Sequence, residues 1–519
     1  MTATIKIHEK DLDKTEVYRK LILLTKKRVD LKKILTKKRI EKCIIKTPLL
    51  GFSFATSLIN DEILKLLQKL ADEQMVVEKY QQILNGSIMN VGEKRAVLHH
   101  KTRSKKRGFY GKEQKKIAAF TKKIHTGTIK GATDKKFETV VQIGIGGSDL
   151  GPRALCLALE KSCQHDALLK ARFIANVDPD DAHQVLNSID FEKTLFIVVS
   201  KSGTTQETLT NLNIIRKKFL EIGYKKENLK KHFIAVTGKG SPLDNPQKYL
   251  ASFYIDDCIG GRYSSTSAVG GAILSLAFGA PVFEKLLKGA FVLDENANKR
   301  NIMENMSLMA ALIGVWERSF LGLPSKAIIP YSEALSRFPA HLQQLDCESN
   351  GKSVNINFKK INYQTGPMIF GEPGTNGQHS FFQKLHQGSD VIPIQFIGFK
   401  HAQINKDKIY MRSTSQKKLI SNLVAQIAAF ALGKYDENEN KNFSGNRPSS
   451  LIFADKLTPY TLGALLAFYE NIVMFQSFIW NINAFDQEGV QLGKILTKKI
   501  LATEHCDDEI LNSLMAIFQ

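Results

Sequence analysis

Seven short apolar runs, separated by stretches of helical character, dominate the sequence from Phe137 onward. They are rich in Val, Ile and Phe and cover residues 139–145, 172–177, 194–199, 232–236, 326–331, 391–399 and 450–454. Buried parallel strands joined by crossover helices have this composition, because both faces of such a sheet are covered. A long helical stretch at about residues 264–322 divides the runs into two groups. The pattern therefore predicts an α/β protein with two parallel sheets.

The charge of the chain is concentrated near its N-terminus. The 519 residues suggest two to four domains, and 43% hydrophobic with 24% charged residues is typical of a globular protein rather than a disordered one. Residues 1–136 hold 33 Lys and Arg against 14 Asp and Glu, so they carry +19 of the net +22. Such a field attracts nucleic acid, acidic membranes and small anions alike. A solvated, Lys-rich surface is its simplest interpretation.

The sequence favours neither a secreted nor a membrane protein. Residues 1–9 lack an apolar core of signal-peptide length. The most apolar stretches, residues 268–283 and 464–485, contain Pro281 and Glu470, so buried helices explain them better than membrane spans. The six Cys form no CxxC pair or His/Cys cluster, which argues against a zinc site. We expect a reducing, cytoplasmic setting and no metal.

A glycine-rich turn, VVQIGIGGSDLG in residues 140–151, follows the first apolar run. Glycines between a strand and a helix let backbone N–H groups approach an anion at the helix N-terminus. Gly144 and Gly146 match the start of a dinucleotide fingerprint, but Asp149 stands where the third glycine is needed. Glycines that only satisfy the backbone angles of a tight turn explain the sequence equally well.

A loop rich in hydroxyl groups follows the third run, in the sequence FIVVSKSGTTQET of residues 196–208. Helix N-capping uses one or two hydroxyls, whereas this loop offers five, together with Lys201 and a flexible Gly203. We expect a helix to begin at about Gln206, so free N–H groups and the helix dipole meet the same hydroxyls. The loop therefore predicts a phosphate-monoester site. It lacks the Gly-Lys-Ser/Thr ending of a nucleoside-triphosphate loop.

Acid–base candidates lie further along the chain. Glu348 follows Gln344 in a stretch that starts helically and ends at a turn, where polar neighbours could orient a proton-transferring carboxylate. His379 lies near the predicted start of a helix, a position that favours neutral imidazole, whereas His386 is more typical of a structural residue. Arg262, beside two glycines, could stabilise an oxyanion. An exposed Glu or a surface Arg next to a turn remains the plain alternative.

The order and spacing of these blocks, from about Asn90 to Lys494, resemble the phosphoglucose isomerase family. Departures from its commonest pattern include Gly92, Cys347, Glu488 and Gln491. The blocks that carry the resemblance are residues 144–150, 200–208, 260–270, 344–352, 371–388, 443–448 and 486–494.

This resemblance implies two sugar-isomerase (SIS-type) three-layer αβα domains with parallel sheets. We expect a mostly helical N-terminal region in residues 1–115 that packs on the larger domain. A smaller SIS domain with the phosphate loop would cover residues 116–285, and a larger one with the catalytic Glu and His residues 286–486. A C-terminal helical tail, residues 487–519, would carry Lys494.

The resemblance also implies reversible interconversion of glucose 6-phosphate and fructose 6-phosphate, without cofactor, by a homodimer with shared sites. Glu348 matches the base, His379 the ring-opening histidine supplied by the neighbouring subunit, Lys494 a group near the ring oxygen and Arg262 the enediolate-stabilising guanidinium. The matching substrate-binding residues are Gly147, Ser148, Ser200, Lys201, Ser202, Gly203, Thr204, Thr205, Thr208, Gln344 and Gln487.

Three other interpretations stay open from the residues alone. A related isomerase could act on a different sugar, such as mannose 6-phosphate. A non-catalytic sugar-phosphate sensor would bind the sugar without proton exchange, although the joint presence of Glu348, His379, Arg262 and Lys494 argues against it. Nucleic-acid binding by the basic N-terminal region would be strongly salt-dependent, but no basic helix interleaved with aromatics supports it.

Overall fold

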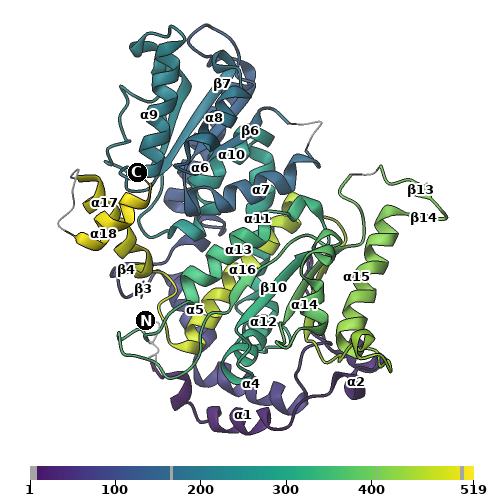
Figure 1. Ribbon diagram of the computed structural model, residues 1–519. Coiled ribbons are helices and arrows are strands. Elements are labelled where there is room, and N and C mark those ends of the chain that lie inside the picture. The colour runs from purple at the N-terminus through teal and green to yellow at the C-terminus, as the bar shows by residue number, and fades with distance from the viewer. Residues whose placement is uncertain (1–8, 164–166, 405, 503–507, 519) are drawn as a thin grey trace.

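The computed structural model describes residues 9–163, 167–404, 406–502 and 508–518. Within these residues the chain forms a five-stranded and a six-stranded sheet, each flanked by helices, and two short hairpins. The five-stranded sheet lies at the top of Figure 1 and the six-stranded sheet below it, with helices between them. The expected α/β class with two sheets is confirmed.

The five-stranded sheet is entirely parallel. Four of its strands are predicted runs, although the run at 172–177 is shifted: the strand there starts and ends earlier. The fifth strand has only three residues, too few to stand out in the sequence. In spatial order the strands are β6 (Lys170–Ile174), β5 (Thr139–Ile143), β7 (Thr194–Ser200), β8 (Phe233–Thr237) and β9 (Ser252–Tyr254).

The six-stranded sheet is parallel over four strands and is extended by two antiparallel ones. The antiparallel pair comes from the N-terminal region expected to be mostly helical, and it joins the sheet by pairing β2 with β15. The spatial order is β1 (Ile44–Lys46), β2 (Gly51–Ser53), β15 (Ser449–Ala454), β12 (Ile394–Phe399), β10 (Ser325–Pro330) and β11 (Met368–Phe370).

Helices account for most of the remaining chain. The N-terminal ones are α1 (Tyr18–Thr25), α2 (Leu31–Ile34), α3 (Lys37–Lys42), α4 (Asp61–Glu73), α5 (Val76–Asn85) and α6 (Gly108–Thr126). Those around the five-stranded sheet are α7 (Leu150–Glu160), α8 (Pro179–Asn187), α9 (Gln206–Glu221) and α10 (Ala268–Phe278). The others are α11 (Ala280–Asn296), α12 (Met306–Val315), α13 (Phe338–Asn350), α14 (Phe382–Gln387), α15 (Ser415–Leu432), α16 (Pro459–Trp480), α17 (Gln491–Ala502) and α18 (Glu509–Met515).

The strands are apolar throughout because neighbouring residues enter different cores. Val140 belongs to the large central core, whereas Val141 packs under α8 and α9. In the other sheet, Ile328 faces the central core and Ile329 packs with residues of α14 and α15. Since the central core also contains α10, α11, α12 and α16, the two sheets share one continuous apolar interior. This shared core fixes the two sheets relative to each other.

The apolar stretches at 268–283 and 464–485 form buried helices, as predicted. Of the helices in the described residues, α16 is the one long and apolar enough to cross a membrane, and its apolar stretch is buried inside the protein. Glu470 of α16 pairs with the fully buried Arg103, which also binds Asp294 of α11 with Nε and Oδ2 2.7 Å apart. Burial raises the pKa of Glu470 to about 7, against the opposing effect of Arg103.

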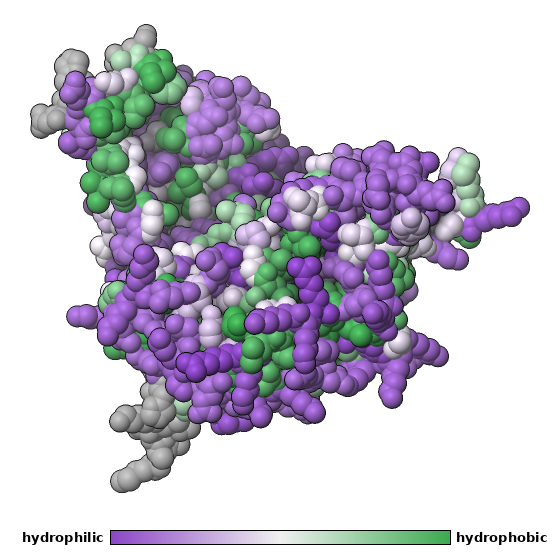
Figure 2. All heavy atoms as spheres, turned by 60° about the horizontal axis from the view of Figure 1, so that its bottom comes forward, coloured by the Kyte–Doolittle hydropathy of each residue, from purple (hydrophilic) through white to green (hydrophobic). Residues whose placement is uncertain are grey.

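The first helices of the Lys-rich N-terminal region, α1, α2 and α4, lie at the bottom of Figure 1, whereas α6 lies beside the five-stranded sheet. The bottom face is largely hydrophilic with an apolar patch near its middle (Figure 2). Lys26, Lys27, Arg28, Lys32 and Lys38 are all exposed. The simplest interpretation of the charge, a solvated surface, is consistent with this exposure.

The strand order reverses once in each sheet, between two neighbouring strands. The five-stranded sheet runs second, first, third, fourth, fifth in chain order, so its connections diverge between β5 and β7. The six-stranded sheet diverges in the same way between β10 and β12. In open α/β sheets, ligands bind at the carboxyl ends of strands where the order reverses. The loops after β5 and β7 are the two that the sequence singles out.

The buried Arg103 cluster gives the first test of the fold. We expect Arg103→Met to lower the free energy of unfolding by about 3 to 5 kcal/mol, because it leaves Asp294 and Glu470 buried without their cation. Lys42→Met, which breaks the exposed pair with Asp61, should cost less than about 1 kcal/mol. Urea unfolding of both variants measures the difference, and equal losses would contradict this role for Arg103.

Candidate active site

The loops after β5 and β7 border a cavity of about 240 Å³ at the diverging strands. Gly147 and Ser148 line it from the first loop, and Ser200, Lys201, Ser202, Thr205 and Thr208 from the second. The helix α9 begins at Gln206, as the sequence predicts, and Thr205 is its N-cap residue without a side-chain capping bond. The hydroxyls and the helix N-terminus therefore face a common space.

The second loop is held in shape by its own hydroxyls. Ser200 Oγ lies 2.9 Å from Thr205 Oγ1 and accepts a hydrogen bond from the Gly203 N–H. Ser202 Oγ likewise accepts from the Thr204 N–H. Thr208, however, is buried with a hydroxyl that has no hydrogen-bond partner in the described part of the chain. A buried polar group of this kind normally has a partner, so Thr208 is suited to a ligand oxygen.

The sequence suggests that Lys201 offers its charge to a bound anion, but in the structure its amine binds the main chain. Its Nζ donates to the carbonyls of Asp257 and Ile259, at 3.3 and 3.2 Å. Burial lowers the pKa of Lys201, and the nearby Asp257 partly restores it. The side chain thus fastens the hydroxyl-rich loop to the segment before Arg262.

The first loop needs glycine for a close approach. A Cβ on Gly147 would lie 2.1 Å from the carbonyl carbon of Gly261, so the two main chains can approach this closely only because residue 147 has no side chain. Gly146 has a φ of +60°, which L side chains rarely adopt. This approach brings the glycine-rich turn against the Gly260–Gly261 segment and places Arg262 next to the cavity.

Arg262 is a buried side chain, which excludes the plain surface alternative. It is 2% exposed, and its Nε donates to Ser349 Oγ at 2.6 Å. Its terminal nitrogens bind Gln487 Oε1 at 2.9 Å and the carbonyls of Ala484 and Asp486. One terminal nitrogen also lies 3.7 Å from Glu348 Oε2. A fixed cation therefore sits beside the candidate base.

The helix α13 carries Gln344 and Glu348 one turn apart, as the predicted helical stretch requires. Both line a second cavity of about 610 Å³, which shares Gln487 with the first. The Glu348 side chain is 23% exposed, so it is reachable from the cavity. Gln344 Oε1 is buried and, among the described residues, lacks a hydrogen-bond partner. A molecule that spans the two cavities would meet the hydroxyl loop at one end and Glu348 at the other.

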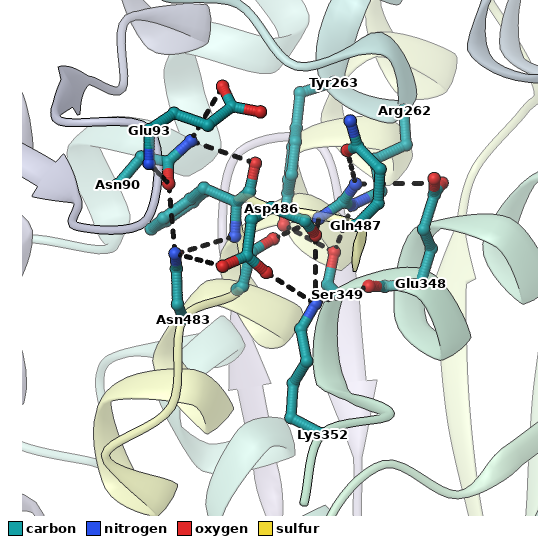
Figure 3. Close-up of polar contacts among 12 residues, drawn as sticks. Asn90, Glu93, Arg262, Tyr263, Glu348, Ser349, Lys352, Asn483, Asp486 and Gln487 are labelled. Atoms are coloured by element: carbon teal, nitrogen blue, oxygen red, sulfur yellow. Dashed lines mark hydrogen bonds and ion pairs between the residues drawn. The ribbon is translucent and has the colours of Figure 1, made fainter. Parts of the chain in front are cut away.

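Residues 483–487 complete the site, although the sequence singles out only Gln487 here. Asp486 lies between Asn483 and Lys352 (Figure 3), with Lys352 Nζ 3.0 Å from Asp486 Oδ1. Asn483 in turn donates to Asn90 Oδ1 at 3.0 Å. In the sequence, these residues could be found only by their position next to predicted site residues: Lys352 follows Glu348 by four residues, and Asp486 precedes Gln487.

His379 and Lys494 are not brought to this site within one chain. His379 ends a short 3₁₀ turn (Asn376–His379) three residues before α14 begins at Phe382, so it lies near a helix start as predicted, and it is exposed. Lys494 is exposed on α17, whose residues are all exposed or half-buried. As far as the chain is described, neither residue lines the two cavities. His386 is structural, as expected, since its ring stacks on Phe430 at 3.8 Å between centroids.

The described residues contain neither a cluster of metal ligands nor the complete dinucleotide fingerprint. In the described ranges, no group of three or more His, Cys, Asp or Glu is arranged to hold a metal ion. Asp149 occupies the third glycine position of the fingerprint and is bound to Arg153, with Oδ1 2.8 Å from Nε. Burial raises the pKa of Asp149, while Arg153 opposes the rise.

Comparison with known proteins agrees with this arrangement. The family model described as phosphoglucose isomerase matches residues 53–514. A protein named glucose-6-phosphate isomerase from Treponema denticola is 57% identical over 466 residues, which is 88% of each chain. One with the same name from Borreliella afzelii is 46% identical over 527 residues, 98% of each chain.

A solved structure is also similar. The crystal structure of a glucose-6-phosphate isomerase from Chlamydia trachomatis superposes with a TM-score of 0.92, at 41% identity, covering 98% of this chain and 99% of that one. Since the family model spans most of the chain and these relatives cover nearly all of it, the chain belongs to the phosphoglucose isomerase family.

Proposed function

We propose that the protein interconverts glucose 6-phosphate and fructose 6-phosphate. The observation that carries this proposal is the placement of Glu348 and Arg262 beside a loop whose Thr208 hydroxyl lacks a partner in the described chain. Such an isomerisation needs a base, a cation for the developing negative charge and a handle for the phosphate. In support of this, the hydroxyl loop lines one of the two adjoining cavities, Glu348 lines the other, and Arg262 lies 3.7 Å from Glu348.

In this proposal Glu348 takes the proton from C2 of the open-chain sugar and returns it to C1. The electron pair left behind moves onto the C1 carbonyl oxygen and gives a cis-enediolate. The proton of the C2 hydroxyl then passes to O1, and the carbonyl forms at C2 as C1 takes up the returned proton. Arg262 stabilises that charge, because its guanidinium is already fixed and desolvated before the reaction. The phosphate, held by residues 200–208, lets binding energy remote from the reaction position C1 and C2. Gln344 and Gln487 contact the sugar between these ends.

The proposal includes a homodimer with shared sites, in which His379 opens the sugar ring of the partner's substrate and Lys494 assists near the ring oxygen. Exposed apolar side chains support it. The β13–β14 hairpin (Ile409–Tyr410 and Ser413–Thr414) projects from the body in Figure 1, and Met411 at its turn is 77% exposed. The α17–α18 segment exposes Leu492, Ile495 and Leu501. Exposed apolar surface of this kind is typical of an interface.

The family comprises enzymes of sugar-phosphate metabolism, and we propose a cytoplasmic location for this protein. The phosphosugar substrate and the Cys pattern, without CxxC pairs, are consistent with a reducing compartment.

The base is tested by Glu348→Gln, which keeps the size of the side chain and removes the carboxylate. We expect turnover to fall by about 10³-fold or more, while affinity for inorganic phosphate is retained. A coupled assay from fructose 6-phosphate in metal-free buffer measures turnover. The exposed Glu333→Gln is the control and should behave as wild type. Near-normal turnover of Glu348→Gln would remove Glu348 from this role.

The phosphate handle is tested by Thr208→Val. We expect a loss of affinity for inorganic phosphate and a rise in KM of about 10- to 100-fold, because one hydrogen bond to a charged ligand is lost. Titration calorimetry with phosphate checks it against Thr210→Val, a half-buried threonine on the same helix. Equal affinities in the two variants would place the phosphate elsewhere.

The shared site is tested by mixing two inactive chains, Glu348→Gln and His379→Asn. In a mixed dimer one site receives both intact residues, so a statistical mixture should recover about a quarter of wild-type activity. Each variant alone should stay inactive. No recovery, with mixed dimers demonstrated by tagging one chain, would mean that each site uses residues of one chain only.

A further inference from the structure

One ion pair next to the candidate base has no role in the mechanism given above. Lys352 and Asp486 are both largely buried, with side chains 15% and 12% exposed, and Lys352 Nζ lies 3.0 Å from Asp486 Oδ1. Burial lowers the pKa of Lys352, whereas Asp486 and Glu348 counteract this. Two charges are thus removed from water beside the reaction centre, where an ordinary ion pair contributes little stability.

Lys352 binds the backbone of the base itself. Its Nζ donates to the Glu348 carbonyl at 3.0 Å and to the Asp486 carbonyl at 2.9 Å. Glu348 lies in the last turn of α13, where carbonyls have no partner within the helix. A cation at a helix C-terminus is also favoured by the helix dipole. The lysine therefore fixes the main chain at the residue whose side chain must transfer the proton.

Asp486 connects this point to the rest of the site. Its Oδ2 accepts from Asn483 Nδ2 at 2.7 Å, and its carbonyl accepts from Arg262 as well as from Lys352. Figure 3 shows Asp486 at the centre of these contacts, between Asn483 and Lys352. Gly92 packs against the same carboxylate, since a Cβ there would lie 2.8 Å from Oδ2. Any shift of Asp486 would therefore move both Lys352 and Arg262.

Several charged groups face Glu348. Arg262 is 3.7 Å from its carboxylate, and Lys352 lies on the following turn. Asp486 lies behind Lys352, and Glu488 lines the same cavity. Asp346, on the same helix, lines a different cavity instead. The charge that Glu348 experiences thus depends on Arg262 and on the balance between Lys352 and Asp486.

We propose that Lys352 and Asp486 form a positioning pair for the proton-transfer step, with Lys352 holding the backbone of Glu348 and Asp486 holding Lys352. This inference rests on the proposed function. Both residues then affect turnover and the charge state of Glu348, in addition to any effect on folding. Neither residue is expected to touch the reacting carbons.

The experiment measures kcat, KM and the pH dependence of kcat/KM for three variants. Lys352→Met and Asp486→Asn should each lower kcat by about 10- to 100-fold with a smaller change in KM, because Glu348 is held less firmly while the phosphate loop is intact. Lys352→Arg keeps the charge and should retain the acidic limb of wild type and most of its turnover.

The pH profiles give the sharper readout, since the two variants break the same pair with opposite signs. Loss of the cation in Lys352→Met favours protonation of the neighbouring carboxylate, so the acidic limb should move to higher pH by about half a unit or more. Loss of the anion in Asp486→Asn leaves Lys352 uncompensated, so that limb should move to lower pH. The double variant should return toward the wild-type profile.

A matched control is Lys326→Met, which breaks the pair of Lys326 with Glu317, 3.1 Å long and similarly buried, in the same half of the molecule. It should lower Tm as the other variants do, with the acidic limb unmoved. Unmoved limbs in both Lys352→Met and Asp486→Asn, or shifts in the same direction, would overturn the proposal. If Lys352→Met does not fold, Asp486→Asn decides alone by the same criterion. An inactive wild-type protein would instead contradict the proposed isomerase function.

Discussion

The site depends on one buried guanidinium. Arg262 joins three parts of the chain more than 80 residues apart: the segment behind the glycine-rich turn, Ser349 on α13, and residues 484–487. A buried charge is tolerated only when its hydrogen bonds are satisfied, and here the protein supplies the partners of every guanidinium nitrogen. Because Arg262 follows the five-stranded sheet and its partners belong to the other half of the molecule, the same contacts join the two halves and shape the candidate active site.

The shared apolar interior makes this possible. One face of each sheet enters the central core together with α10, α11, α12 and α16. The core therefore fixes the diverging strands of one sheet in position relative to those of the other. The five-stranded sheet supplies the hydroxyl loop and the six-stranded half supplies α13. Under the proposed function, the end of the site that holds the phosphate and the end that transfers the proton therefore come from different sheets.

Under the proposed function, a single chain does not bring all of the proposed site residues together. The hydroxyl loop lines one of the two adjoining cavities and Glu348 lines the other, with Arg262 beside Glu348, while His379 and Lys494 lie exposed and, in the described chain, line neither cavity. The hairpin at Met411 and the leucines of α17 likewise leave apolar side chains exposed to water, which is unfavourable. A second copy of the chain would account for both facts at once.

Much of the architecture could be predicted from the sequence, because strands buried on both faces are apolar at every position and stand out as short runs. The glycine and hydroxyl patterns after two of these strands, and the family blocks that hold Glu348 and Arg262, likewise depend only on local residue order. The strands β1 and β2 cannot be recognised in the sequence because each has only three residues: β2 forms by pairing with β15, about 400 residues away, and β1 by pairing with β2. The burial of Arg262, the hydrogen bonds of Lys201 to backbone carbonyls and the Lys352–Asp486 pair follow no local pattern.

The sequence by itself determined the fold class, the loops and the candidate residues, since these follow from periodicity and residue type. Only the tertiary structure decided which charges meet, because long-range packing sets the distances and burial on which their chemistry depends.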